Sequence, residues 1–404
     1  MQTRTDPVME AFRFSKYISD KRYRAITFQF FALLALCAFI AWLISNAVTN
    51  LENLGQDISY NFLGSAAGYD INQKPISFTS QDTHLRAAFV GALNTLIVAF
   101  LGCITATILG VVAGVLRLSN NWVVSKMMAV YVEAFRNVPV LIWILIIFSI
   151  MTVSMPAPNA FRGADPEATM LFGSFAFTNR GIYVPAPIWE AGSMIVVITF
   201  ILSVIGMFAY RRYATKVLYD TGRLLPTGWP SLVIFFVPAI LMFFIMGRPI
   251  GLEYPSLQGF NFQDGIQVRG SLIALWLALS VYTGAFIAEN VRAGILAISQ
   301  GQTEAAGALG MRPNRIMNLV VLPQALRVII PPLISQYLNL TKNSSLAIAV
   351  GYMDITSTLG GITLNQTGRA IEAILLLMLF YLVISLGISA IMNVYNNAVK
   401  LKER

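Results

Sequence analysis

Long apolar runs alternate with short polar segments along the whole chain, and this alternation is its dominant pattern. A helix rises about 1.5 Å per residue, so crossing the hydrocarbon core of a bilayer takes about 20 apolar residues. Runs of about that length occur throughout the sequence. We therefore predict eight transmembrane helices, over residues 26–48, 88–115, 127–153, 188–209, 229–248, 270–291, 328–350 and 370–394.

Composition places the chain in the membrane class. Of its 404 residues 56% are apolar and only 12% are charged, and the mean hydropathy is +0.68. Such values are typical of a polytopic membrane protein, so we expect an all-α bundle of transmembrane helices. The longer polar segments are loop-sized and leave no room for a separate soluble domain. The two cysteines, Cys37 and Cys103, fall inside apolar runs, which indicates buried thiols.

Basic residues predict the orientation of the spans. The net charge of +9 does not indicate nucleic-acid binding, because the basic residues cluster beside apolar runs. If the N-terminus is in the cytoplasm, nineteen of the counted Lys and Arg residues lie on the inner side and seven on the outer side. This excess of basic residues inside favours that orientation over its inverse. We expect cytoplasmic tails at 1–25 and 395–404 and an outer loop at 49–87. The run 26–48 is too long for a signal peptide and is predicted to stay as the first span.

Two Glu-x-x-Arg pairs lie beside spans, Glu133 with Arg136 and Glu289 with Arg292. Residues three apart share one face of a helix, so each pair can neutralise itself. The apolar run that follows Arg136 is about 17 residues, or about 25 Å, which is nearly a full span. Both pairs are therefore expected near the cytoplasmic mouth. We predict that the four side chains line an inner gate; the alternative is that they are self-paired anchors at helix ends.

A short polar island separates the spans 270–291 and 328–350. Residues 302–310 predict a brief helix with small side chains, Ala305, Ala306 and Ala308, where a partner can approach closely. Gly310 can end that helix, and Arg312 with Pro313 follows as a breaker. A helix too short to cross a bilayer, held between two that do, is suited to contact a cytoplasmic partner.

This island resembles the EAA loop of binding-protein-dependent ABC importer permeases, on Glu304-Ala305-Ala306, Gly310 and Leu322-Pro323. Val320 departs mildly from the family, which usually has Ile there. Further segments resemble the polar amino-acid permeases in particular: 131–139, 284–295 and 340–346. The resemblance covers the permease core, 88–153 and 270–394. The region 154–269, with two extra spans, is an insertion similar to that of one permease subunit of the general L-amino-acid importers.

The resemblance implies a type I ABC importer fold and a set of partners. The partners would be a second, different permease, a dimer of ATPase subunits, a soluble periplasmic amino-acid-binding protein, membrane lipid and an amino-acid substrate. ATP and Mg²⁺ would be bound by the ATPase, with no cofactor in this chain. The ATPase would dock on Gln302, Glu304, Ala305, Ala306, Gly310 and Arg312 and drive alternating access. The location implied is the bacterial inner membrane.

A polar block in the seventh span is a candidate substrate site. Lys342 is followed by Asn343, Ser344 and Ser345, at a depth of about 15 Å from the cytoplasmic entry. A zwitterionic amino acid needs its carboxylate met by a cation or by amide and hydroxyl donors. Lys342 could be that cation, or Glu372 on the next span could balance it. Two further polar residues in core spans, Asn94 and Thr283, are candidates for the site or for hydrogen bonds between helices.

Catalytic chemistry is poorly supported by the sequence. It contains no G-x-x-x-x-G-K-[ST] phosphate loop. The only histidine, His84, lies in a predicted outer loop beside Asp82 and Arg86 and is expected to be solvated. Neither a Ser/His/Asp set nor a zinc-ligand spacing is visible, so a membrane-embedded enzyme is disfavoured.

Two non-enzymatic alternatives remain open. An ion-gradient-driven secondary transporter would favour a symmetric pair of broken helices across two halves, and the sequence shows no such pair. A non-transporting scaffold for the ATPase would keep the cytoplasmic helix, yet it would show no uptake defect when Arg136 or Lys342 is changed.

Overall fold

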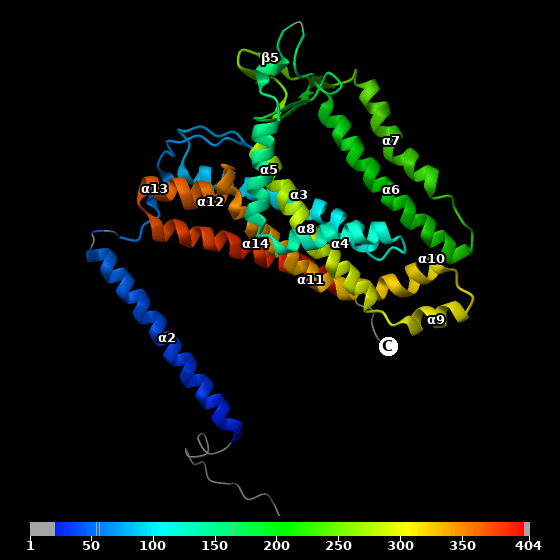
Figure 1. Ribbon diagram of the computed structural model, residues 1–404, viewed down its shortest axis with the longest axis horizontal. Coiled ribbons are helices and arrows are strands. Elements are labelled where there is room, and N and C mark those ends of the chain that lie inside the picture. The colour runs from blue at the N-terminus through cyan, green and yellow to red at the C-terminus, as the bar shows by residue number, and fades with distance from the viewer. Residues whose placement is uncertain (1–20, 54, 56, 164, 400–404) are drawn as a thin grey trace, which may run out of the picture.

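The computed structural model describes residues 21–53, 55, 57–163 and 165–399, and the chain is a bundle of long helices with a small β-layer at one end (Figure 1). In the described part, seven helices are long and apolar enough to cross a membrane, or eight if one bent pair counts as a span. The predicted all-α transmembrane bundle is thus confirmed. Parts of both predicted tails, 1–20 and 400–404, lie outside the described residues. The long helices are α2 (Lys21–Asn53), α3 (His84–Leu116), α6 (Ser193–Thr221), α7 (Gly228–Ile245), α8 (Gly270–Leu296), α11 (Leu322–Asn343) and α14 (Ala370–Val399).

The centre of the bundle is a close crossing of α3 and α8. At Gly110 of α3 an added Cβ would lie 2.5 Å from Ile287, and at Gly114 it would lie 2.7 Å from the Ala288 carbonyl oxygen. Small residues spaced four apart let two membrane helices approach in this way. A core of buried residues from α3, α8 and α11, including Val98, Leu279 and Leu340, continues from the crossing.

The predicted span 127–153 is two helices rather than one. Helix α4 (Trp122–Asn137) and α5 (Val140–Ser154) meet at an angle of 106°. Val138 is extended, as expected for a residue that precedes proline, and Pro139 has no N–H to continue the ladder. The apolar stretch that crosses the bundle is therefore α5 alone.

The insertion 154–269 is an α6–α7 hairpin whose outer ends are joined by strands (Figure 1). Strands β1 (Ala176–Thr178), β2 (Gly181–Val184) and β7 (Ile266–Arg269) form an antiparallel sheet in that order. Strands β3 (Ala186–Trp189) and β4 (Ile250–Glu253) pair directly above the hairpin, and β5 (Ser256–Gln258) pairs with β6 (Asn261–Gln263). These segments were predicted as loops, except that the predicted span 188–209 included the end of β3. Helix α6 starts at Ser193, later than the predicted 188. It also ends later than predicted, because the helix continues through Arg211, Arg212 and Lys216.

The seventh predicted span changes character part of the way along. Helix α11 ends at Asn343 and a 3₁₀ helix, η4 (Ser344–Val350), continues it. An outer segment then returns to α14 through short turns, α12 (Ile355–Ser357), η5 (Thr358–Thr363) and α13 (Leu364–Thr367). This segment packs on α3 so closely that a Cβ at Gly91 would lie 2.2 Å from the Thr358 hydroxyl oxygen.

Helix α2 stands apart from the bundle (Figure 1). None of its side chains from Arg24 to Asn53 is buried by the described chain. An apolar helix of this length needs either lipid or a partner helix around it. The outer loop after it includes η1 (Asn61–Gly64) and contacts the outer segment instead: the backbone N–H of Ser59 donates to Glu372 Oε1 at 3.1 Å.

Candidate functional site

The short helix predicted for the polar island is present as α9 (Gln300–Ala308), between α8 and α10 (Pro313–Ile316) (Figure 1). Gly310 follows it with a φ of 75°, a left-handed conformation that glycine adopts without strain. The N–H of Met311 donates to the Ala306 carbonyl oxygen at 3.3 Å. The helix therefore ends in the left-handed glycine that the sequence led us to expect.

Helix α9 is held by one residue and exposes the rest. Ala306 is buried against Ile316 and Val321, whereas the other residues of α9 are exposed. Gln302, Glu304, Ala305 and Arg312 are thus accessible, as a docking surface requires. Ala306, which was predicted to face a partner, packs inward within this chain.

A charged cluster joins three helices at the same end of the bundle. Arg117, the residue after α3, forms an ion pair with Glu289 of α8 and lies 3.7 Å from Oε1 of Glu133 on α4. Glu289 also accepts from Arg292, at 2.6 Å. Arg117 and Glu289 are largely shielded from solvent, with side-chain exposures of 16% and 23%. We call Arg117, Glu133, Glu289 and Arg292 the charged cluster.

The cluster departs from the predicted pairing. Glu289 and Arg292 do pair, but Glu133 lies beside Arg117 rather than Arg136. The guanidinium of Arg136 instead lies over the Phe286 ring, 5.3 Å from its centroid, in a cation–π contact between α4 and α8. Arg117 was missed as a site residue. Its position, as the first charge after the α3 apolar run, was the available signal.

The polar block lies at the junction of α11 and η4. Lys342 is exposed on this chain, Asn343 and Ser345 are half-buried, and Ser344 is fully buried and donates to the Thr341 carbonyl oxygen at 2.7 Å. Glu372 does not balance Lys342, because its carboxylate accepts from Arg369 at 3.3 Å and from the Ser59 N–H. The alternative of a Lys342–Glu372 pair is therefore wrong.

Asn94 connects α3 to two outer segments. Its Nδ2 donates to the carbonyl oxygens of Gln73 at 3.0 Å and Met353 at 2.9 Å, and its side chain is almost fully buried. Nearby, the hydroxyl of Tyr352 donates to the Asn94 carbonyl oxygen at 3.0 Å. The alternative role was hydrogen bonding to a neighbouring helix; the side chain of Asn94 instead bonds two non-helical segments. Thr283 is also buried, on α8.

Asp354 is a buried carboxylate that the sequence analysis did not single out. Its Oδ1 accepts from the Ser357 N–H at 2.9 Å, which caps α12, while Oδ2 is buried without a hydrogen bond in the described structure. Burial raises the pKa of Asp354 above its ordinary value. Its position between an apolar run and a Thr/Ser cluster was the only sequence signal.

His84 is not solvated, contrary to the prediction. It is the first residue of α3, it is buried, and its Nδ1 lies 3.0 Å from the Thr363 hydroxyl oxygen. Tyr69 and Phe62 flank its ring. The residue thus connects α3 to the outer segment. Among the described residues, no group of three or more His, Cys, Asp or Glu side chains is placed to hold a metal ion.

The fold defines a class of protein, a polytopic helical membrane protein, in which the short helix α9 is exposed between two long helices. Residues 203–401 match the family described as "Binding-protein-dependent transport system inner membrane component". The "Glutamate/glutamine/aspartate/asparagine transport system permease protein BztB" of Rhodobacter capsulatus is 51% identical over 100% of both chains. The "General L-amino acid transport system permease protein AapQ" of Rhizobium johnstonii is 41% identical over 98% of this chain and 96% of its own length.

The chain therefore belongs to the family of binding-protein-dependent inner-membrane permeases, the membrane subunits of ABC importers, and the recognition from sequence is confirmed. It is a multi-pass transporter subunit rather than an enzyme. A solved structure titled "Crystal structure of an amino acid ABC transporter with histidines" overlaps with a TM-score of 0.45 at 18% identity, covering 78% of this chain and 95% of that chain. That overlap adds nothing to the assignment.

Proposed function

We propose that the chain is a permease subunit of an ATP-driven importer of L-amino acids, with polar and acidic amino acids as its substrate class. The observation that carries the proposal is the end-to-end similarity to a permease protein named for glutamate, glutamine, aspartate and asparagine transport. A second relative, similar over nearly its whole length, is named for general L-amino acid transport. The shared length includes the α6–α7 insertion, so the likeness extends beyond the permease core.

Coupling to ATP hydrolysis is assigned to α9. The ATPase subunit, which binds ATP and Mg²⁺, docks on the exposed face that carries Gln302, Glu304 and Ala305, with Gly310 and Arg312 at its end. The contact of Ala306 with Ile316 and Val321 supports this role, because it connects the helix to the base of α11. A displacement of α9 by the ATPase would then be transmitted to the core helices.

The inner gate is assigned to the charged cluster together with Arg136. Arg117, Glu133 and Glu289 belong to α3, α4 and α8, so these three helices cannot separate at this end without breaking ion pairs. A set of ion pairs that holds one state and breaks in the other is the kind of element that nucleotide and binding protein can bias. Alternating access then means that the cluster is intact in one state and separated in the other.

The substrate path is assigned to the side of α11 that exposes Lys342. A lysine exposed on a membrane helix is placed against a polar path or a partner rather than against hydrocarbon. We propose that Lys342, Asn343, Ser344 and Ser345, with Asn94 and Thr283 in the supporting core, line a path shared with a second, different permease.

The remaining partners in this proposal are a periplasmic amino-acid-binding protein on the β-layer side and lipid around α2. In the same proposal both termini are cytoplasmic.

The test is reconstitution of the two permeases and the ATPase dimer in proteoliposomes with the binding protein. We expect uptake of labelled L-glutamine that requires ATP inside and binding protein outside. Glu304→Lys should abolish uptake without preventing assembly of the membrane subunits. Uptake by this chain alone under an ion gradient would contradict the proposal and support a secondary transporter.

A further inference from the structure

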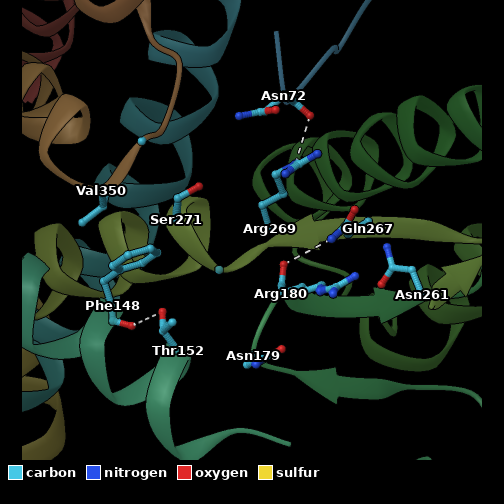
Figure 2. A pocket seen from close by; sticks show the side chains of 12 residues that line it. Asn72, Phe148, Thr152, Asn179, Arg180, Asn261, Gln267, Arg269, Ser271 and Val350 are labelled. Atoms are coloured by element: carbon cyan, nitrogen blue, oxygen red, sulfur yellow. Dashed lines mark hydrogen bonds between the residues drawn. The ribbon is translucent and has the colours of Figure 1, made fainter. Parts of the chain in front are cut away.

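A polar cavity lies between the β-layer and the outer ends of the core helices (Figure 2). Its volume is about 440 Å³, which is within the range of small-molecule sites. In Figure 2, residues of the β-layer lie on one side and Phe148 and Thr152 of α5 with Ser271 of α8 on the other, and the Arg269 side chain extends toward Asn72. We call it the outer cavity; it is lined by Asn72, Phe148, Thr152, Asn179, Arg180, Asn261, Gln267, Arg269, Gly270, Ser271, Val350 and Gly351.

Two arginines give the outer cavity a positive charge. The register of β2 and β7 pairs Gly181 with Arg269, so Arg180 and Arg269 come from neighbouring strand ends. Asp and Glu are not found among its lining residues in the described structure. The carboxylate of Asp70 interacts with Arg269, but it is also bonded to Lys74 at 2.6 Å, whose charge balances it. The cavity therefore favours an anion.

The arginines are fixed in place by backbone contacts. Nε of Arg269 donates to the Asn72 carbonyl oxygen at 3.1 Å, and Nη1 of Arg180 donates to that of Phe260 at 3.2 Å. Each guanidinium has five N–H donors, so one such bond leaves others for a carboxylate, which the planar fork suits. Gln267 reinforces the arrangement by donating to the Arg180 carbonyl oxygen at 3.2 Å (Figure 2).

Asn179 supplies a hydrogen-bond acceptor, whereas the two arginines supply donors. Its Oδ1 is buried and accepts no hydrogen bond in the described structure. A buried acceptor without a donor is unfavourable, so rotation of the Asn179 side chain toward the cavity would let this oxygen receive the ammonium group of a ligand. Carboxylate donors and an ammonium acceptor in one cavity match an amino-acid zwitterion.

The outer cavity also adjoins the proposed substrate path. Val350 and Gly351 line it, and they end the 3₁₀ helix η4 that starts at Ser344 of the polar block. Seven residues of 3₁₀ helix span about 14 Å. The cavity and the polar block are thus at the two ends of one segment.

We propose that the outer cavity is a transit site for a free L-amino acid, with Arg180 and Arg269 binding the α-carboxylate and Asn179 the α-ammonium. The proposal rests on the import function proposed above. It gives the insertion a role, because Asn179, Arg180, Asn261 and Gln267 all belong to the inserted β-layer. An acidic side chain of a docked binding protein has the same carboxylate chemistry, so the experiment must separate the two sources.

A cysteine placed in the cavity can report occupancy by protection from alkylation. Thr152→Cys is a mild change, because the Thr152 hydroxyl bonds only within its helix among the described contacts, to the Phe148 carbonyl oxygen. The background is Cys37→Ser with Cys103→Ala, in the full complex held in nanodiscs without binding protein. L-Glutamine should slow reaction with a membrane-impermeant maleimide, whereas 4-aminobutanamide, which lacks the α-carboxylate, should not.

Arginine variants test the assignment of the carboxylate. Arg180→Gln and Arg269→Gln should each weaken L-glutamine protection about tenfold or more, as loss of a charge-assisted hydrogen bond implies. Arg162→Gln is the matched control, since Arg162 is an exposed arginine of the same insertion that does not line the cavity. Affinity for the binding protein should be unchanged in all three variants, which also shows that they fold.

Three results would overturn the inference: no protection in the parent, protection that survives both arginine changes, or a loss of binding-protein affinity with protection unchanged. The last would make the arginines a docking surface. These failures are distinct from failure of the import function, which would appear as absent ATP-dependent uptake in the parent complex. A parent that imports but shows no protection keeps its function and loses only the transit site.

Discussion

Arg117 at the end of α3 and Glu289 on α8 form an ion pair that connects the two most closely packed helices at one end of the bundle. Glu133 of α4 lies 3.7 Å from the same guanidinium, so one arginine holds three helices. Because both partners of the central pair are mostly shielded, removing one of them costs more than it would in a surface salt bridge.

Breaking this pair should alter transport. Glu289→Gln removes the carboxylate that Arg117 and Arg292 share and leaves Arg117 only the more distant Glu133. We expect this to destabilise the charged cluster by about 1–3 kcal/mol. We expect higher basal ATP hydrolysis, or a changed uptake rate, in proteoliposomes. Arg315→Gln, an exposed arginine outside the cluster, is the control. Unchanged rates in Glu289→Gln would make the four charges simple anchors.

The cytoplasmic helix allows a matched test of coupling. Gly310→Asp places a side chain at a φ of 75°, where the strain is about 1–2 kcal/mol, beside the proposed docking face. Gly222 ends α6 with a φ of 69° and equally open surroundings, so Gly222→Asp carries the same strain elsewhere. Substrate-stimulated ATP hydrolysis should be lost only in Gly310→Asp. Loss in both variants would indicate general damage instead of uncoupling.

Asn94 should be important for stability at the outer end. Asn94→Ala removes two buried hydrogen bonds and leaves the Gln73 and Met353 carbonyl oxygens without this donor. We expect a loss of about 2–4 kcal/mol, measured as a lower midpoint of thermal unfolding in nanodiscs. Asn365→Ala removes one exposed bond and should change the midpoint little. Equal effects of the two changes would argue against this role.

At Gly181 the β-layer has no room for a side chain. At Gly181, φ is 128° and an added Cβ would lie 2.3 Å from the Val268 carbonyl oxygen of the paired strand. Gly181→Ala should therefore disrupt the pairing of β2 with β7. We expect it to destabilise the β-layer by more than the roughly 1 kcal/mol that conformational strain alone would cost. Faster proteolysis within 154–192 is the expected readout. Gly173→Ala, at a positive φ in open space, should be cut at nearly the parent rate.

Asp354 predicts a pH dependence of stability. Burial raises the pKa of Asp354, so the folded chain favours its protonated form. This stabilisation is fully present below the ordinary pKa and is lost as pH rises through the raised one. Asp354→Asn keeps an acceptor for the Ser357 N–H and should flatten the decline of the unfolding midpoint from mildly acidic to neutral pH.

Asp70 serves as a control because its pKa is shifted in the opposite direction. A hydrogen bond from Lys74 lowers the pKa of the Asp70 carboxyl, so its stabilisation is present above the ordinary pKa and is lost as pH falls. Because the side chain is exposed, Asp70→Asn should change the profile little, and only at acidic pH. If the unfolding midpoint of Asp354→Asn varies with pH as it does in the parent, Asp354 is not the source of the pH dependence.

The order of the apolar helices and the short polar helix α9 followed from the sequence because each depends on local chemistry. Apolar length determines where a helix can cross, Gly310 ends α9 through its own backbone freedom, and small residues in the island predict an exposed helix. Pro139 carried the signal for the break between α4 and α5, although the apolar run around it favoured a single span.

Only the tertiary structure determined which side chains become partners across the bundle. The pairing of Glu133 with Arg117 rather than Arg136, the burial of His84, and the placement of Arg180 and Arg269 around one cavity each depend on segments distant in the sequence. No local pattern encodes those meetings, because they follow from the α3–α8 crossing and from the strand register of the insertion. Local periodicity determines elements, whereas packing between distant elements determines which charges meet.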